Sequence, residues 1–312
     1  MRWKTIRKTC QILVGLGGAG LTVASLGQTG SPQAGPSPAI DAAALVRRAV
    51  ANHFAQQAAH QPQSFALHRR DERHNVVREI METPQGDVAM LVAVNGAPLS
   101  ATGRQAEIDR LNNLAENPDL QAHRQKREQE DQARVDSLMH LLPDAFIYHY
   151  DATVACNMST MPNVQVPGAA AAVAPAPAVV SQCYHLKFSP NPHFDPPNIE
   201  AKVLKGMAGE VWIEKSDERL LRLSAQLIDD VDFGWGIVGR LDRGGTVYLE
   251  QTEVRDKDWE LTRMKLSFTG KALLVKPINI RLSEEMANFA QMPANTDYKK
   301  AIEMLEAGPA GK

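Results

Sequence analysis

Two glycine patterns are the first residues in this sequence whose spacing could do chemistry. Gly15-x-Gly17-x-x-Gly20 follows a short apolar run, and the same spacing recurs over residues 234–239. Such spacing lets a backbone approach a pyrophosphate at the N-terminus of a helix, as in dinucleotide-binding enzymes. However, Gly-, Pro- and Ser-rich sequence follows the first copy where a second strand is required, and no helical pattern follows the other. Neither copy therefore predicts a cofactor site, and we expect no cofactor.

Other residue types that carry out catalysis or bind metals do not form a known motif. The sequence has no H-E-x-x-H, G-x-S-x-G or P-loop string. His193 and Asp195 lie in a proline-rich loop, and the acidic cluster Asp229, Asp230 and Asp232 lacks the glycine-spaced loop of calcium sites. We expect no catalytic residue, no metal site and no enzymatic activity. A hydrolase that uses scattered His and Asp residues stays open as an alternative.

The N-terminus has the three-part layout of a secretory signal peptide. Basic residues precede Thr9, an uncharged run extends to Gly27, and small residues end it. We therefore predict a signal peptide over residues 1–27, cleaved between Gly27 and Gln28, and a linker over residues 28–37. An uncleaved anchor is the alternative. The mature protein is predicted to be periplasmic or secreted.

Length and composition limit the remaining possibilities. The chain has 312 residues, 44% hydrophobic and 22% charged, which suits a soluble domain spanning residues 38–312. A formal net charge of -2 argues against a nucleic-acid partner, because such proteins need a basic surface. Apart from the N-terminal segment, no apolar run is long enough to span a bilayer, so we expect no transmembrane span in the mature chain.

Two cysteines remain after the predicted cleavage. Cys156 and Cys183 flank an Ala/Pro-rich loop over residues 157–182, with strand-like sequence on either side. In an oxidising compartment a disulfide between them would close the base of this loop and stabilise the fold by about 3–4 kcal/mol. The alternative is a zinc site that combines Cys183 with His185 and His149.

Helical patterns occur in two main regions. The first begins near the Ser37–Pro38 start signal, with Asp41 expected in its first turn. The second is an insertion over about residues 100–142 that Asn117–Pro118 interrupts. Its middle part is charged with mixed sign, which is typical of a solvated helix face. The alternative is a protruding arm that docks another envelope protein.

The rest of the chain reads as antiparallel strands. Three strand-like pieces form a meander before residue 97, in which His68 and His74 are expected to be exposed. After Phe146, apolar and polar residues alternate, which predicts an antiparallel sheet buried on one side only. The fold class is therefore α+β, a curved half-barrel with helices covering its concave face. The inward residues are expected to be Val211, Ile213, Leu221, Leu223, Ala225, Leu227, Met264, Leu266, Phe268, Ile278, Ile280 and Leu282.

The strings "GMAGEVWIE", "DVDFG", an "EQ" strand and a following W-x-L resemble the C-terminal part of the LolA-like lipoprotein-carrier superfamily. The likeness covers roughly residues 64–293, is best after Val203, and looks closest to a group of uncharacterised secreted bacterial proteins. The resemblance implies an apolar ligand held between a half-barrel and its helices. It supplies no catalytic residue. The helical insertion and the Ala/Pro loop depart from the carrier pattern.

The predicted function is non-enzymatic binding of a lipid, a lipoprotein acyl chain or another apolar ligand, with a lipidated protein as possible partner. Leu223, Leu249, Leu266 and Phe268 are predicted to line the lumen. Phe233 and Trp235 are predicted at its rim, on a glycine-rich turn, or alternatively as packed corner residues. The alternative function is a structural or interaction module whose core is filled by its own helices.

Overall fold

The computed structural model describes residues 40–156, 161–168, 181–233, 238–255, 257–273 and 276–308. The predicted signal peptide, its Gly27–Gln28 cleavage site and the linker over residues 28–37 lie outside these ranges. Trp235 and most of the 157–182 loop also lie outside them.

The described chain forms a large open antiparallel sheet and five helices, which confirms the α+β class. The helices are α1 (Ala42–Ala59), α2 (Ala101–Glu116), α3 (Pro118–Ala145), the short 3-10 helix η2 (Glu200–Gly206) and α4 (Tyr298–Ala307). None of the helices in these ranges is long and apolar enough to cross a membrane. The strands are β1 (Gln63–Asp71), β2 (Asn75–Met81), β3 (Val88–Val94), β4 (Ala97–Pro98), β5 (Phe146–Cys156), β6 (Ser181–Pro190), β7 (Met207–Glu214), β8 (Arg219–Leu227), β9 (Val231–Phe233), β10 (Gly239–Leu241), β11 (Thr246–Arg255), β12 (Asp258–Ala272) and β13 (Lys276–Gln291).

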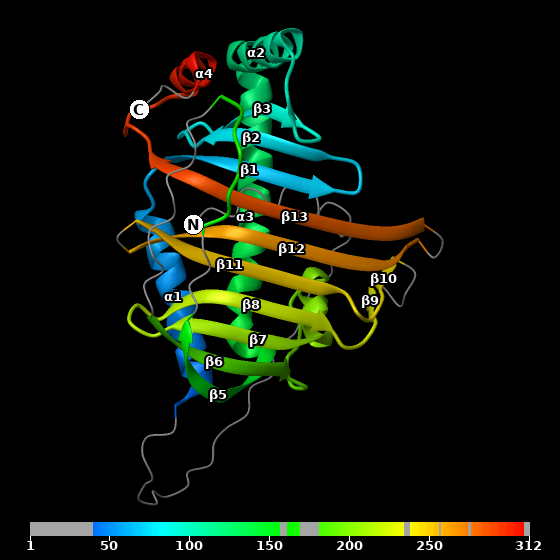
Figure 1. The fold of residues 1–312 in the computed structure, drawn as a ribbon. Helices are drawn as coiled ribbons and strands as arrows, with labels where there is room; N and C mark the ends of the chain where they lie inside the picture. The colour runs from blue at the N-terminus through cyan, green and yellow to red at the C-terminus, as the bar shows by residue number, and fades with distance from the viewer. Residues whose placement is uncertain are drawn as a thin grey trace, which may run out of the picture.

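The strand order joins the two ends of the chain. It runs β4-β3-β2-β1-β13-β12-β11-β8-β7-β6-β5, and the β9–β10 hairpin pairs with β12 (Figure 1). The N-terminal meander therefore continues the sheet beyond the last strand, with Leu67 opposite Met286. Of the second glycine pattern, Gly239 begins β10, which pairs with β9, while residues 234–237 lie outside the described ranges.

Local sequence sets the helix boundaries. Asp41 is the N-cap of α1, because its Oδ1 accepts a hydrogen bond from the Ala44 N–H at 2.9 Å. The prediction that Asp41 lies inside the first turn is therefore wrong by one position. The predicted break in the insertion is confirmed: Asn117 caps α3 and Pro118 occupies its first turn, where its missing N–H costs nothing.

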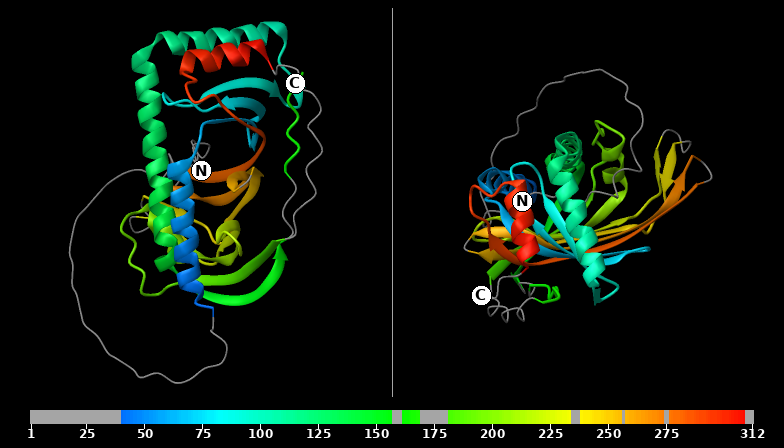
Figure 2. Two further views of the ribbon diagram at one scale, coloured as in Figure 1. Left: turned by 90° about the vertical axis from the view of Figure 1, so that its left-hand side faces the viewer. Right: turned by 90° about the horizontal axis from the view of Figure 1, so that it is seen from above.

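Helices α1 and α3 lie against one face of the sheet (Figure 2). Val135 and Met139 of α3 pack with Met264 and Leu282 of the central strands, which confirms the alternation read from β12 and β13. In the charged middle of α3, Lys126, Arg127 and Glu130 are exposed, as expected, but Glu128 is buried.

Leu221 is a correction to the predicted inward set. A register shift in the β7–β8 pairing places Leu220 opposite Ile213 and Leu223 opposite Val211. One extra residue in β8 reverses the direction of the side chains that follow. Leu221 therefore packs in a separate small cluster with the cysteine pair and Trp259.

The sheet is not buried on one side only. At its β1–β3 end, apolar residues of α2, α4 and residues 161–168 pack on the face opposite α3. Val164 and Val166 are buried there, so this part of the predicted structureless loop is packed against the sheet. The physical reason is visible in β3, which is apolar throughout (VAMLVAV) and needs cover on both faces.

Cys156 and Cys183 form the predicted disulfide, with Cα atoms 5.2 Å apart. His185, which the zinc alternative required, stacks on Trp212 with ring centroids 4.7 Å apart, and its Nδ1 lies 3.0 Å from an Asp151 carboxylate oxygen. The two cysteine sulfur atoms are therefore bonded to each other rather than to a metal.

Candidate functional site

A cavity of about 370 Å³ lies between strands β1–β3 and helices α2 and α3. This volume falls within the range of small-molecule sites. Part of its wall is apolar, formed by side chains on alternate positions of the three strands, namely Leu67, Val76, Ile80, Ala89 and Leu91. These are the same strands whose other face packs against α4 (Figure 2). The cavity therefore lies on the face of the sheet that α3 covers.

Four arginines share this cavity: Arg69, Arg78, Arg110 and Arg124. Arg69 donates to the Glu284 carboxylate at 3.0 Å and lies 3.3 Å from Asp71. Arg110 pairs with Glu107 at 2.7 Å and also donates to the Ala89 carbonyl at 2.9 Å. Acidic and backbone partners thus hold two of the four guanidinium groups in place.

Arg78 differs from these two. Within the described ranges its guanidinium forms no ion pair and no hydrogen bond, although the residue lies half-buried among charged neighbours. Burial lowers the pKa of Arg78, and the positive charge of Arg69 lowers it further, while Glu107 acts in the opposite direction. A desolvated guanidinium without a counter-ion attracts an anion of suitable shape.

Glu284, on β13, lies opposite Arg69 in the β1–β13 strand pairing. The residue is fully buried, and burial raises the pKa of its carboxyl group to about 7, against the opposing effect of Arg69. Near neutral pH a fraction of Glu284 is therefore protonated. In that fraction Arg69 lacks its full counter-charge, which makes the cavity more positive.

One His–Asp pair also lines the cavity. His74 Nδ1 lies 2.9 Å from Asp71 Oδ1, which also accepts the backbone N–H groups of Arg73 and His74 in the turn between β1 and β2. Burial opposes ionisation of Asp71, but these hydrogen bonds outweigh it and lower the pKa to about 2. His74 is largely exposed, as expected. The lining residues include no Ser, Thr or Cys nucleophile.

The residues predicted to bind ligand lie elsewhere in the same core. Leu223, Leu266 and Phe268 are partly buried against it, while Leu249 and Phe233 are buried, Phe233 at only 1% exposure. None of these five described residues lines the cavity. Phe233 occupies the packed position that was its alternative interpretation.

Sequence reasoning missed the arginines because it ranked inward positions by hydrophobicity alone. In β1 the cavity-facing positions read Leu67, Arg69 and Asp71, and in β2 they include Arg78 and Ile80. Charged residues at the inward positions of a buried strand are costly unless they have a role, so this pattern was a usable signal.

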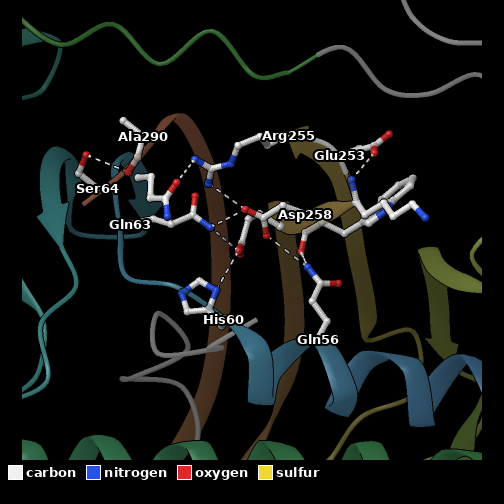
Figure 3. Close-up of polar contacts among 12 residues, drawn as sticks. Gln56, His60, Gln63, Ser64, Glu253, Arg255, Asp258 and Ala290 are labelled. Carbon is white, nitrogen blue, oxygen red and sulfur yellow. Dashed lines mark hydrogen bonds and ion pairs between the residues drawn. The ribbon is translucent and has the colours of Figure 1, made fainter. Parts of the chain in front are cut away.

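A second polar cluster lies at the other end of β1 (Figure 3). Asp258, at the start of β12, accepts hydrogen bonds from Gln63 at 3.0 Å and from Arg255 at 2.9 Å. Gln63 also donates to Glu260 at 3.0 Å, so one amide group joins two carboxylates. His60, just after α1, points into this cluster (Figure 3).

Two carboxylates flank the His60 ring. Its Nε2 lies 2.6 Å from Glu82 Oε2, and its Nδ1 lies 3.4 Å from Glu260 Oε1. Burial by itself lowers the pKa of His60, but the nearby Glu260 carboxylate and the hydrogen-bonded Glu82 carboxylate outweigh it and raise the value to about 9. The sequence offered no sign of this cluster, since its members come from distant segments.

No family model matches the chain, and no curated protein matches it either.

Proposed function

We propose that this chain is a non-enzymatic binding protein of the cell envelope whose ligand is amphipathic, with an apolar group and an anionic head. A lipid or a lipoprotein acyl chain has this chemistry. The proposal includes export, with removal of residues 1–27, and a LolA-like half-barrel as the scaffold. The open sheet with α1 and α3 on one face supports that scaffold.

The observation that carries the proposal is the combination, in one cavity, of an apolar wall and the Arg78 guanidinium, which forms no ion pair with any residue that the structure describes. Each methylene buried against the wall contributes about 0.8 kcal/mol. A charge-assisted hydrogen bond to an anionic head contributes about 1.5–3 kcal/mol. Together they favour a molecule that carries both groups over a purely apolar one.

A second candidate function is hydrolysis, because His74 and Asp71 form a hydrogen-bonded pair at the cavity. In that reaction His74 would accept a proton from water, with Asp71 orienting the ring. The arginines would then stabilise an anionic transition state. A rate of ester hydrolysis that depends on His74 would favour this function over binding alone.

The test measures binding of a fluorescent fatty-acid probe to the wild type and to two tryptophan variants. Ala89→Trp fills the cavity beside Arg78, whereas Leu266→Trp fills the originally predicted lumen on the same face of the sheet. We expect the wild type and Leu266→Trp to bind the probe and the folded Ala89→Trp variant to lose binding.

The other outcomes identify the alternatives. Loss of binding in Leu266→Trp alone would move the site to the predicted lumen. If the wild type binds no probe, the chain is better explained as an interaction module with a filled core, for which the exposed part of α3 is the available docking surface for another envelope protein.

A further inference from the structure

The partly buried cluster around His60 lies at the end of β1 opposite the cavity, and the proposed function does not use it. Its members are His60, Asp258 and Glu260, whose ligand atoms all lie within 4.8 Å of one another. We propose that His60, Asp258 and Glu260 bind a divalent transition metal ion of the zinc class.

The geometry of the histidine fits a metal ligand. The side chain of His60 is only 5% exposed, and its Nδ1 is buried without a hydrogen-bond partner. Two ligands held 2.0–2.1 Å from a tetrahedral zinc ion are about 3.3 Å apart. The distance from His60 Nδ1 to Glu260 Oε1, 3.4 Å, matches this separation.

The surrounding groups orient these ligands. Glu82 Oε2 accepts from His60 Nε2 at 2.6 Å, which fixes the ring and leaves Nδ1 for the metal. Histidine ligands of zinc usually donate their second nitrogen to a carboxylate in this way. Gln63 donates to both Asp258 and Glu260 at 3.0 Å, and thereby holds the two carboxylates side by side.

Charge and donor type also favour a zinc-class ion. Asp258, Glu260 and Glu82, together with Arg255 that pairs with Asp258 at 2.9 Å, carry a net charge that balances a divalent cation. On metal binding His60 releases its Nδ1 proton to solvent, and the imidazole then adds the nitrogen donor that calcium and magnesium do not select. Three protein ligands leave a fourth tetrahedral position for water. Because His60 directly follows α1 and the two carboxylates lie on β12, the ion would join the end of the helix to the sheet.

The test is zinc titration of the full chain, freed of metal with a chelator, by isothermal calorimetry and by thermal unfolding. We expect one zinc ion per chain at micromolar or tighter affinity, and a higher melting temperature with zinc. His60→Ala should abolish both effects. Glu82→Gln, which replaces the orienting carboxylate by an amide of the same size, should weaken zinc binding about 10- to 100-fold. His193→Ala, at an exposed histidine outside both the cluster and the cavity, is the matched control and should bind zinc as the wild type does.

Asp258→Asn covers the case in which His60→Ala fails to fold, because the Asp258 side chain is 24% exposed and its substitution is less disruptive. Cobalt provides a second readout: the wild type should show the intense visible absorption of tetrahedral Co²⁺, and Asp258→Asn should lose it. A wild type that binds no zinc at micromolar concentration would overturn the proposal. So would zinc binding that Asp258→Asn and Glu82→Gln leave unchanged.

Discussion

Replacing Arg78 should change stability and binding in opposite directions. In the described ranges its guanidinium has no ion pair, so Arg78→Leu removes a partly desolvated charge and adds apolar surface to the cavity wall. We expect the free energy of unfolding to rise by about 1 kcal/mol, since an unpaired charge is costly to bury. The same change removes the proposed contact to the anionic head. A loss of about 1.5–3 kcal/mol of binding free energy corresponds to an affinity for the anionic ligand that is about 10- to 150-fold weaker.

The assay compares a fluorescent fatty acid with its methyl ester, in parallel with urea unfolding. The wild type should prefer the acid, and Arg78→Leu should bind both probes equally. Arg78→Lys keeps the charge and should keep most of the preference. Arg110→Leu is the matched control: it deprives Glu107 and the Ala89 carbonyl of their donor and should lower the free energy of unfolding.

Two results would refute this reasoning. The first is destabilisation by Arg78→Leu as large as that by Arg110→Leu, which would mean that Arg78 has a structural partner. The second is an unchanged preference for the acid in Arg78→Leu, which would place the anionic head elsewhere.

Three further predictions concern other parts of the chain. Cys183→Ser should lower the free energy of unfolding of the oxidised protein by about 3–4 kcal/mol, measured by urea denaturation. As the control, reduction of the wild-type disulfide should lower the free energy of unfolding by the same amount. Two free thiols in the oxidised wild type would contradict the prediction. Because the pKa of Glu284 is raised, its contribution to stability is fully present below pH 4.5 and is lost as pH rises through about 7. The free energy of unfolding should fall by about 3 kcal/mol over this range. Glu284→Gln should remove that part of the pH dependence. Identical pH profiles of the two proteins would show that Glu284 does not titrate in this range. N-terminal sequencing of exported protein should begin at Gln28, and a sequence that begins at Met1 would favour the anchor alternative.

The sequence by itself determined the features that depend on neighbouring residues. Period-two alternation in β12 and β13 predicted which side chains face the helices, and Asn117–Pro118 predicted where the insertion divides, because a capping amide and a proline act within one turn. The pairing of Cys156 with Cys183 was likewise predicted from the order of the cysteines and the loop between them. The LolA-like relationship and the lipid ligand stay predictions.

Only the tertiary structure decided which charged residues meet. Gln63 and Asp258 are 195 residues apart in sequence, yet they are hydrogen-bonded because β1 joins the sheet beside β13. The bulge that turns Leu221 away depends on strand register, which no local pattern specifies. Among the described residues the Arg78 guanidinium has no ion-pair partner, and whether a charge has a partner depends on all the residues around it. The energy of a charge depends on its surroundings, so neither the cavity nor the His60 cluster could be found before the fold was known.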